Sequence, residues 1–266
     1  MSDPVIVVDQ VHKAFAGHRV LNGVSLTVSA GETVAILGRS GTGKSVLLKT
    51  IIALLDPDRG KVQVFGKDLH ALSEHGRLKA RAGIGYVFQG AALFDSLTVL
   101  ENVGFALYQQ RRPEDEIRRE VIKRLEMVGL GDAIDKIPSE LSGGMQKRVG
   151  LARAIIGEPR LILYDEPTTG LDPLTTDVIN RIILRLRRKL GVTSVVVTHD
   201  IRSAFTIADR IIMLEQGVIV AEGTPDEIQA SDNIWVHNFI TGHSGDLDTS
   251  GSRPRIQAIA AIDPDE

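Results

Sequence analysis

The octapeptide GRSGTGKS at positions 38–45 restricts the fold of this chain more than any other sequence feature. It follows the apolar run 34–37 and precedes residues 45–55, whose apolar side chains recur at helical spacing. A G-x-x-x-x-G-K-[ST] pattern between a strand and a helix forms a loop whose backbone amides surround phosphate oxygens. We therefore predict an α/β fold with a phosphate site made by Gly38, Arg39, Ser40, Gly41, Thr42, Gly43, Lys44 and Ser45.

Two side chains of this loop and two carboxylates farther along the chain predict chemistry on the bound phosphates. Lys44 is expected to reach the β- and γ-phosphates of a nucleoside triphosphate, and the Ser45 hydroxyl to ligate Mg²⁺. The apolar run 161–164 ends in Asp165 and Glu166, where a parallel sheet places its ligand crevice. We predict that Asp165 supports the magnesium shell and that Glu166 polarises the attacking water as general base.

A second glycine-rich loop, LSGG at 141–144, precedes a stretch that we expect to be helical from 148 to 156. Backbone amides at a helix N-terminus favour a bound anion. Ser142, Gly143 and Gly144 are therefore a second candidate contact with phosphate.

These motifs, in this order, resemble the nucleotide-binding subunits of ABC transporters, whose signature loop reads Leu-Ser-Gly-Gly. The resemblance covers about residues 5 to 230. It implies a P-loop NTPase fold with a RecA-like core, an antiparallel β subdomain and an inserted helical subdomain. It also implies an enzyme that binds and hydrolyses ATP with Mg²⁺.

The resemblance implies roles for four further residues. Phe15 stands where the family has the aromatic, usually Tyr, that stacks on adenine. Gln89 matches the Q-loop glutamine, with a part in catalysis and in the magnesium shell, and Asp172 matches the D-loop aspartate at the nucleotide. His199 matches the switch histidine, whose imidazole can bind the γ-phosphate. Each also has a structural interpretation: Phe15 as core, and Gln89 and His199 as ordinary strand ends.

The length of 266 residues favours one large domain or two modest ones. Ile117, Val121, Leu125 and Val128 mark one face of a helix, within a helical subdomain expected at about 91–157. We assign 1–241 to the ABC ATPase domain. Residues 242–266 carry Gly, Ser, Asp and Pro with few large apolar side chains, which predicts a flexible tail.

Composition excludes several classes of partner and site. The 31 Lys and Arg residues balance 34 Asp and Glu residues, so we expect no nucleic acid partner. The absence of cysteine excludes disulfides and thiolate metal sites. The apolar runs fall far short of the roughly 20 residues that span a bilayer, and the N-terminus lacks the pattern of a secretory signal. We expect a cytoplasmic chain.

The resemblance implies two partners. In the family the signature loop sits too far from the phosphate loop of its own subunit, so two copies in a head-to-tail dimer complete two ATP sites. Such a dimer has twofold symmetry. Because the chain itself has no expected membrane segment, transport requires a separate integral-membrane permease. That places the chain peripherally on the cytoplasmic face of the inner membrane.

The residues around Gln89 indicate a subfamily. The segments 88–94, 97–99 and 101–103, together with Met145 where most relatives carry Gln, resemble the ATPases of Mla-type lipid transporters. Phospholipid transport between membranes, with an MCE-type lipid-binding subunit reached through the permease, is the expectation. One alternative is the ATPase of an amino-acid or osmolyte importer. Another, from a different class, is a soluble ABC ATPase of DNA repair or translation.

Overall fold

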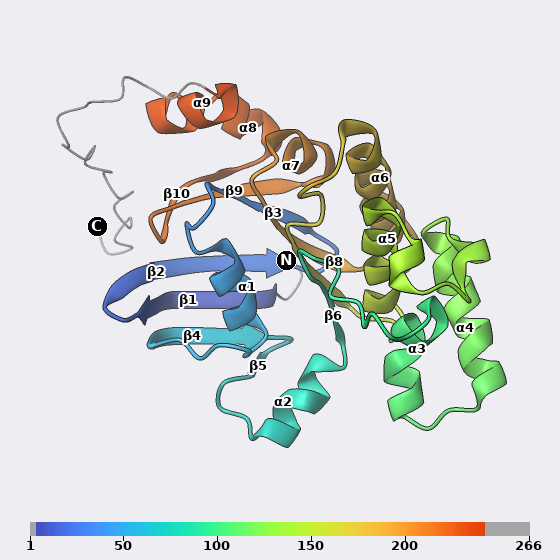
Figure 1. Cartoon of the computed structure of the whole chain (residues 1–266). Coiled ribbons are helices and arrows are strands. Elements are labelled where there is room, and N and C mark those ends of the chain that lie inside the picture. Colours follow the sequence, from blue (N-terminus) through green and yellow to red (C-terminus); the bar gives the residue numbers. More distant parts are fainter. Residues whose placement is uncertain (1–3, 243–266) are drawn as a thin grey trace.

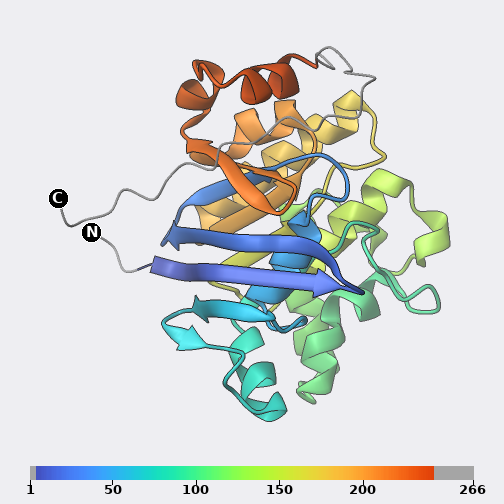
Figure 2. The ribbon, with the colours of Figure 1, turned by 90° about the vertical axis from the view of Figure 1, so that its left-hand side faces the viewer.

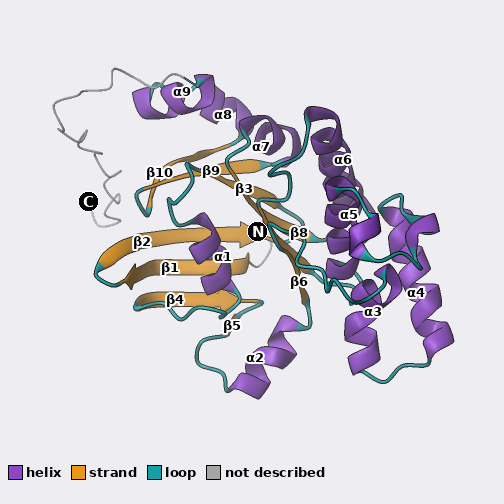
Figure 3. Cartoon of the chain, in the orientation of Figure 1, coloured by secondary structure: helices purple, strands orange, loops and turns teal. Residues whose placement is uncertain are grey.

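The computed structural model describes residues 4–242, which form two sheets and surrounding helices (Figure 1). The predicted flexible tail, 242–266, lies outside the described residues apart from Gly242. The helices α3 and α4 stand apart from both sheets, as an arm beside the strands (Figure 3). No helix within residues 4–242 combines the length and apolar character needed to cross a membrane.

The smaller sheet is antiparallel and has the strand order β2-β1-β4-β5. Figure 2 faces this sheet, with its strands in blue and cyan. The turn between the first two strands is tight because Ala16 and Gly17 both have positive φ, 47° and 82°. Several bulges interrupt the pairing of these strands, which increases their twist. The strands are β1 (Pro4–Phe15), β2 (His18–Ser29), β4 (Arg59–Val64) and β5 (Lys67–Asp68).

The larger sheet has the order β10-β9-β3-β8-β7-β6. All neighbouring pairs from β9 to β6 are parallel, and β10 pairs antiparallel with β9. The central strands are buried on both faces, as their continuous apolar runs predict. The strands are β3 (Thr33–Leu37), β6 (Ile84–Val87), β7 (Leu161–Asp165), β8 (Thr193–Thr198), β9 (Arg210–Glu215) and β10 (Val218–Gly223).

Alternate residues of the central strands belong to different hydrophobic cores. Val34 and Ile36 of β3 pack with α1 and the antiparallel sheet, whereas Ala35 and Leu37 pack with α7 to α9. A third core joins the helical arm to α5 and α6. The helices are α1 (Lys44–Ile51), α2 (Glu74–Arg81), α3 (Val99–Gln109), α4 (Glu114–Met127), α5 (Gly143–Ala154), α6 (Pro173–Leu190), α7 (Ile201–Ile207), α8 (Pro225–Gln229) and α9 (Ile234–Thr241), with 3₁₀ turns η1 (Gly131–Ala133) and η2 (Pro138–Glu140).

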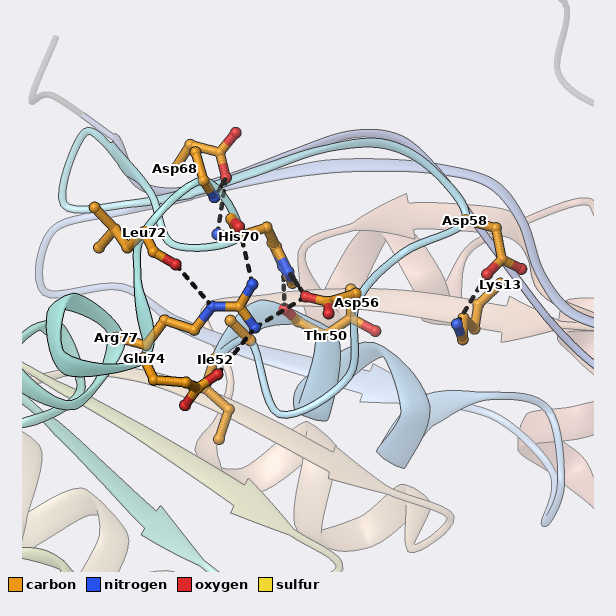
Figure 4. A network of polar contacts seen from close by, with 12 residues as sticks. Lys13, Thr50, Ile52, Asp56, Asp58, Asp68, His70, Leu72, Glu74 and Arg77 are labelled. Carbon is orange, nitrogen blue, oxygen red and sulfur yellow. Dashed lines mark hydrogen bonds and ion pairs between the residues drawn. The ribbon is translucent and has the colours of Figure 1, made fainter.

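A polar network closes the C-terminal end of α1 (Figure 4). His70 Nε2 lies 2.9 Å from the carbonyl oxygen of Thr50, and His70 Nδ1 lies 2.9 Å from Asp56 Oδ1. Arg77 pairs with Asp56 at 3.1 Å, and Arg81 donates to the carbonyls that follow α1. Because the last carbonyls of a helix lack partners within the helix, these side chains fix α1 against the segment that leads to β6.

Several predicted elements are present with different bounds. The helix expected at 45–55 ends at Ile51, because Ala53 takes a left-handed conformation with φ 53°. The helix expected at 148–156 begins earlier, at Gly143, because Ser142 caps it. Residues 91–157, where a helical subdomain is expected, include α3 to α5. The side chains of Ile117, Val121, Leu125 and Val128 are buried there. The boundaries 1–241 and 91–157 stay predictions.

Candidate active site

The loop between β3 and α1 approaches two other strands so closely that it requires glycine at two positions. A Cβ atom on Gly38 would lie 2.3 Å from the carbonyl oxygen of Leu214. At Gly43, which has φ 102°, a Cβ atom would lie 2.7 Å from the carbonyl oxygen of Val20. Residues 38–45 are thereby held between β9 and β2, with their amides at the N-terminus of α1, an arrangement that suits a phosphate group.

Lys44 is buried at the base of this loop, with 5% of its surface exposed. Its Nζ atom donates to the carbonyl oxygens of Gly38 and Arg39, both at 2.9 Å. The same Nζ lies 3.4 Å from Glu166 Oε1. The ammonium group therefore joins the phosphate loop to the carboxylate that follows β7.

Glu166 takes a left-handed backbone conformation, with φ 51°, although it is not glycine. Its amide donates to the carbonyl oxygen of Val197, which ties it to β8. Its Oε2 atom accepts hydrogen bonds from Thr169 Oγ1 at 3.1 Å and contacts His199 Nδ1 at 2.8 Å. Non-glycine residues in this conformation concentrate at functional sites, where the surroundings hold them in place.

Ser45 and Asp165 form the second pair at this edge of the sheet. The Ser45 hydroxyl donates to Asp165 Oδ1 at 2.6 Å, and the Tyr86 hydroxyl donates to Asp165 Oδ2 at 3.0 Å. Burial, and the adjacent Asp165 charge, raise the pKa of Tyr86, so the phenol remains a donor. Both oxygens of the carboxylate are fixed by hydroxyl groups.

Gln89 lies on an exposed turn two residues beyond β6. Lys147 of α5 positions it, because Lys147 Nζ donates to the carbonyl oxygen of Gln89 at 2.8 Å and to that of Glu166 at 3.4 Å. Burial lowers the pKa of Lys147, and the charge of Glu166 opposes that shift. The structure thus brings the backbone of Gln89 beside that of Glu166.

The signature-like loop and Asp172 meet each other at a separate place. Ser142 caps α5 through the amide of Met145, and Asp172 caps α6 through the amides of Leu174 and Thr175. A Cβ atom on Gly144 would lie 2.5 Å from Thr175 Cγ2, so the two helix starts are in contact. Within residues 4–242, no hydrogen bond or ion pair joins Ser142, Gly143, Gly144 or Asp172 itself to Lys44 or Glu166.

Phe15 ends β1 with 44% of its surface exposed, which excludes the interpretation of a core residue. The ammonium of Lys13 lies 5.5 Å from the centroid of its ring. His199 is also exposed, directly after β8, and of its two ring nitrogens only Nδ1 has a partner among the described residues. Both side chains are accessible to a ligand.

Three residues that hydrogen-bond to the predicted site residues Asp165, Glu166 or Gln89 were not predicted from sequence. They are Tyr86, Lys147 and Thr169. Tyr86 precedes Gln89 by three residues, and its alternating position in a short strand was the available signal. Thr169 lies three residues after Glu166, and a lone hydroxyl at that spacing predicts no specific contact. Lys147 lies five residues after Ser142, and only the orientation of α5 brings it to Glu166.

Residues 21–169 match the protein family described as ABC transporter. The chain is 40% identical over 238 residues to the probable ribonucleotide transport ATP-binding protein mkl of Mycobacterium tuberculosis, covering 89% of this chain and 66% of that protein. It is also 40% identical to the intermembrane phospholipid transport system ATP-binding protein MlaF of Haemophilus influenzae, covering 86% and 87%. A third relative at 40% is the methionine import ATP-binding protein MetN of Carboxydothermus hydrogenoformans, covering 84% and 67%.

Solved structures give the same result. The chain superposes on cbiO1 from Clostridium perfringens, part of the ABC transporter complex cbiONQ, with a TM-score of 0.80 at 32% identity, covering 89% of this chain and 95% of that one. It superposes on the dimeric ATP-binding cassette MJ0796 bound to ADP and Pi with a TM-score of 0.77 at 35% identity, covering 83% and 98%. The P-loop NTPase fold predicted from sequence is confirmed.

Proposed function

Because the chain belongs to the ABC transporter family as one of its ATPase subunits, we propose that it powers phospholipid transport between membranes through a separate permease. The observation that carries the ATPase chemistry is the position of Glu166. Its carboxylate lies between Lys44 of the phosphate loop and His199 at the end of β8. A carboxylate held at that place can act as a base and accept a proton from water beside the terminal phosphate of ATP.

In this proposal each residue of the candidate site has a separate role. Lys44 and the amides of 38–45 hold the β- and γ-phosphates, while Phe15 stacks on adenine through its exposed ring. Glu166 takes the proton from water. His199, oriented by its Nδ1 contact with Glu166, presents its other ring nitrogen to the γ-phosphate.

The residues present fit a magnesium ion. Mg²⁺ prefers hard oxygen ligands, is held by one or two protein groups, and completes its shell with phosphate and water. Ser45 and Asp165 offer such oxygens 2.6 Å apart, and the side chain of Gln89 would add an amide oxygen. When bound, the ion neutralises charge that develops on the phosphates. Tyr86 and Ser45 keep the Asp165 carboxylate oriented for it.

ABC cassettes dimerise and work with membrane permeases, and a related cassette is dimeric with ADP and Pi bound. For this chain we propose the head-to-tail dimer. Ser142, Gly143 and Gly144 then close the ATP site of the second copy, because within residues 4–242 they form no hydrogen bond or ion pair with Lys44 or Glu166. Asp172 would face the same interface.

The proposal of a lipid substrate depends on fewer observations than the ATPase assignment. The segment after β6 and Met145 resemble Mla-type ATPases, and MlaF is among the relatives at 40% identity. We propose an MCE-type subunit bound through the permease, with this chain peripheral on the cytoplasmic face of the inner membrane. Import of an amino acid is the second candidate, because MetN aligns at the same identity.

Purification of the full chain from native membranes, followed by identification of its stable partners, tests the proposal. We expect a permease together with an MCE-type subunit, and an ATP-dependent transfer of labelled phospholipid between two vesicle populations by the complex. A partner permease that takes up methionine, with ATP hydrolysis stimulated by that amino acid, would contradict the lipid assignment and leave the ATPase assignment intact.

A further inference from the structure

The turn that carries Gln89 contains two consecutive alanines in a left-handed conformation. Ala91 and Ala92 have φ 60° and 49°. This conformation is unfavourable for residues with a Cβ atom, and non-glycine residues adopt it singly where surrounding contacts determine it. Contacts from outside the turn must therefore hold this pair in place.

One face of α5 supplies those contacts. Lys147, Gly150 and Arg153 follow each other at intervals of three residues, so they lie on the same side of the helix. Arg153 Nη2 donates to the carbonyl oxygen of Ala91 at 2.6 Å, and Arg153 Nη1 to that of Ala92 at 2.7 Å.

The rest of this face also contacts the turn. Gly150 packs against Ala91, where an added Cβ atom would lie in ordinary contact at 3.5 Å. The Arg153 guanidinium also lies 6.0 Å from the ring centroid of Phe88. Lys147 holds the other end of the turn, at the carbonyl oxygen of Gln89. Figure 1 shows α5 and β6, from which the turn emerges, and the two elements are in contact.

We propose that α5 is a rigid connection between the turn 88–92 and the signature loop at its own N-terminus, and that Lys147 and Arg153 are its positioning residues. Both cations are partly buried, and burial lowers the pKa of each. Displacement of the turn therefore moves α5, and with it Ser142. Through Lys147 the same helix is attached to the backbone of Glu166.

At position 153 the connection requires the forked guanidinium group of arginine, whereas at position 147 it requires only a positive charge. Two carbonyl oxygens bound by the two terminal nitrogens of one guanidinium cannot both be held by an ammonium in the same geometry. At position 147 a single Nζ reaches both carbonyls, and arginine can replace it. This difference gives variants with opposite expectations.

The experiment compares Arg153→Lys with Arg148→Lys in the full chain. Arg148 is the matched control, because it lies on α5 and also donates to two carbonyls, those of Val128 and Gly129, away from the turn. Without nucleotide, Arg153→Lys should accelerate amide hydrogen exchange in 88–94 about tenfold, equivalent to ~1.4 kcal/mol. Arg148→Lys should leave that exchange unchanged. Equal acceleration in both variants, or none in Arg153→Lys, overturns the proposal.

A second, kinetic experiment rests on the proposed ATPase roles of Gln89 and Glu166. In the complete transporter, Arg153→Lys and Lys147→Met should lower kcat about tenfold with the KM for ATP within twofold of wild type, and Lys147→Arg should restore kcat. A rise in KM with kcat retained overturns the positioning role. If the wild-type complex fails to hydrolyse ATP, the proposed function fails, and the exchange experiment still tests the connection.

Discussion

Nδ1 of His199 lies 2.8 Å from Oε2 of Glu166, and the backbone amide of His199 points at the same oxygen from 3.3 Å. The carboxylate that we propose as general base is therefore held by the residue that ends β8. The contact fixes the imidazole as well, so its second nitrogen has a defined position beside Glu166. One interaction thus orients both Glu166, the proposed base, and the His199 imidazole, which we expect to contact the γ-phosphate.

Replacement of His199 by alanine should separate binding from turnover. We expect ATP affinity to be retained, because Lys44 and the loop amides remain, and kcat to fall at least about tenfold, or ~1.4 kcal/mol in transition-state stabilisation. Steady-state hydrolysis by the assembled transporter measures this. His237→Ala, on the distant helix α9, is the control. Unchanged hydrolysis in His199→Ala would show that its contact with Glu166 is only structural.

Lys44→Ala should remove most ATP binding. The substitution deletes a buried cation that reaches both the loop carbonyls and Glu166, and it leaves that carboxylate uncompensated beside the incoming phosphates. We expect affinity to fall at least about a hundredfold, or ~2.7 kcal/mol, in a fluorescent nucleotide titration. Lys49→Ala, near the end of the same helix, should bind normally. Near-wild-type affinity in Lys44→Ala would contradict the assignment of the loop.

The sequence predicted the site where local pattern and chemistry coincide. The loop 38–45 and the pair Asp165 and Glu166 follow strands whose apolar runs are unambiguous, so their meeting at one edge of the sheet could be predicted. The helix α2 was not predicted, because it has no buried residue and hence no apolar periodicity. The contacts of Lys147 and Arg153 could not be predicted from sequence either, because they depend on how α5 is oriented against a turn more than fifty residues earlier.

Glu215 should make stability depend on pH. It is buried, its Oε2 atom has no hydrogen-bond partner in the described part of the chain, and burial raises its pKa above 4.5, against the opposing charges of Arg39 and Lys44. A group whose pKa is raised on folding favours the folded state at low pH, and this contribution is lost as pH rises through the folded value.

Glu215→Gln should therefore raise the free energy of unfolding near neutral pH, because the variant buries no charge there. The difference from wild type should disappear below about pH 4.5, where the glutamate is protonated in both states. Urea titrations across this range measure it, with the exposed Glu126→Gln as control. A destabilised Glu215→Gln at neutral pH would show that Arg39 and Lys44 outweigh the burial.

Glu166→Gln tests the catalytic mechanism. The amide has the shape of the carboxylate and cannot accept the proton from water, so hydrolysis should fall about 10²-fold or more while MgATP still binds. Lys44 also loses its anionic partner at 3.4 Å, which leaves its charge to the phosphates and favours the ATP-bound form. A variant that hydrolyses ATP at the wild-type rate would contradict the role of Glu166 as base.

The same variant tests whether the ATP site is shared between two copies. ATP bound to the loop 38–45 of one copy and to Ser142 of the other stabilises the dimer by mass action, so Glu166→Gln with MgATP should accumulate a closed dimer in the complete transporter. A further Ser142→Arg should abolish it by placing a bulky cation at the interface. Ser142 also caps α5, so that change alone costs about 1 kcal/mol of helix stability. Ser142→Ala removes the cap without the bulk and should keep most of the dimer. Closure that survives Ser142→Arg would show that each ATP site belongs to a single chain.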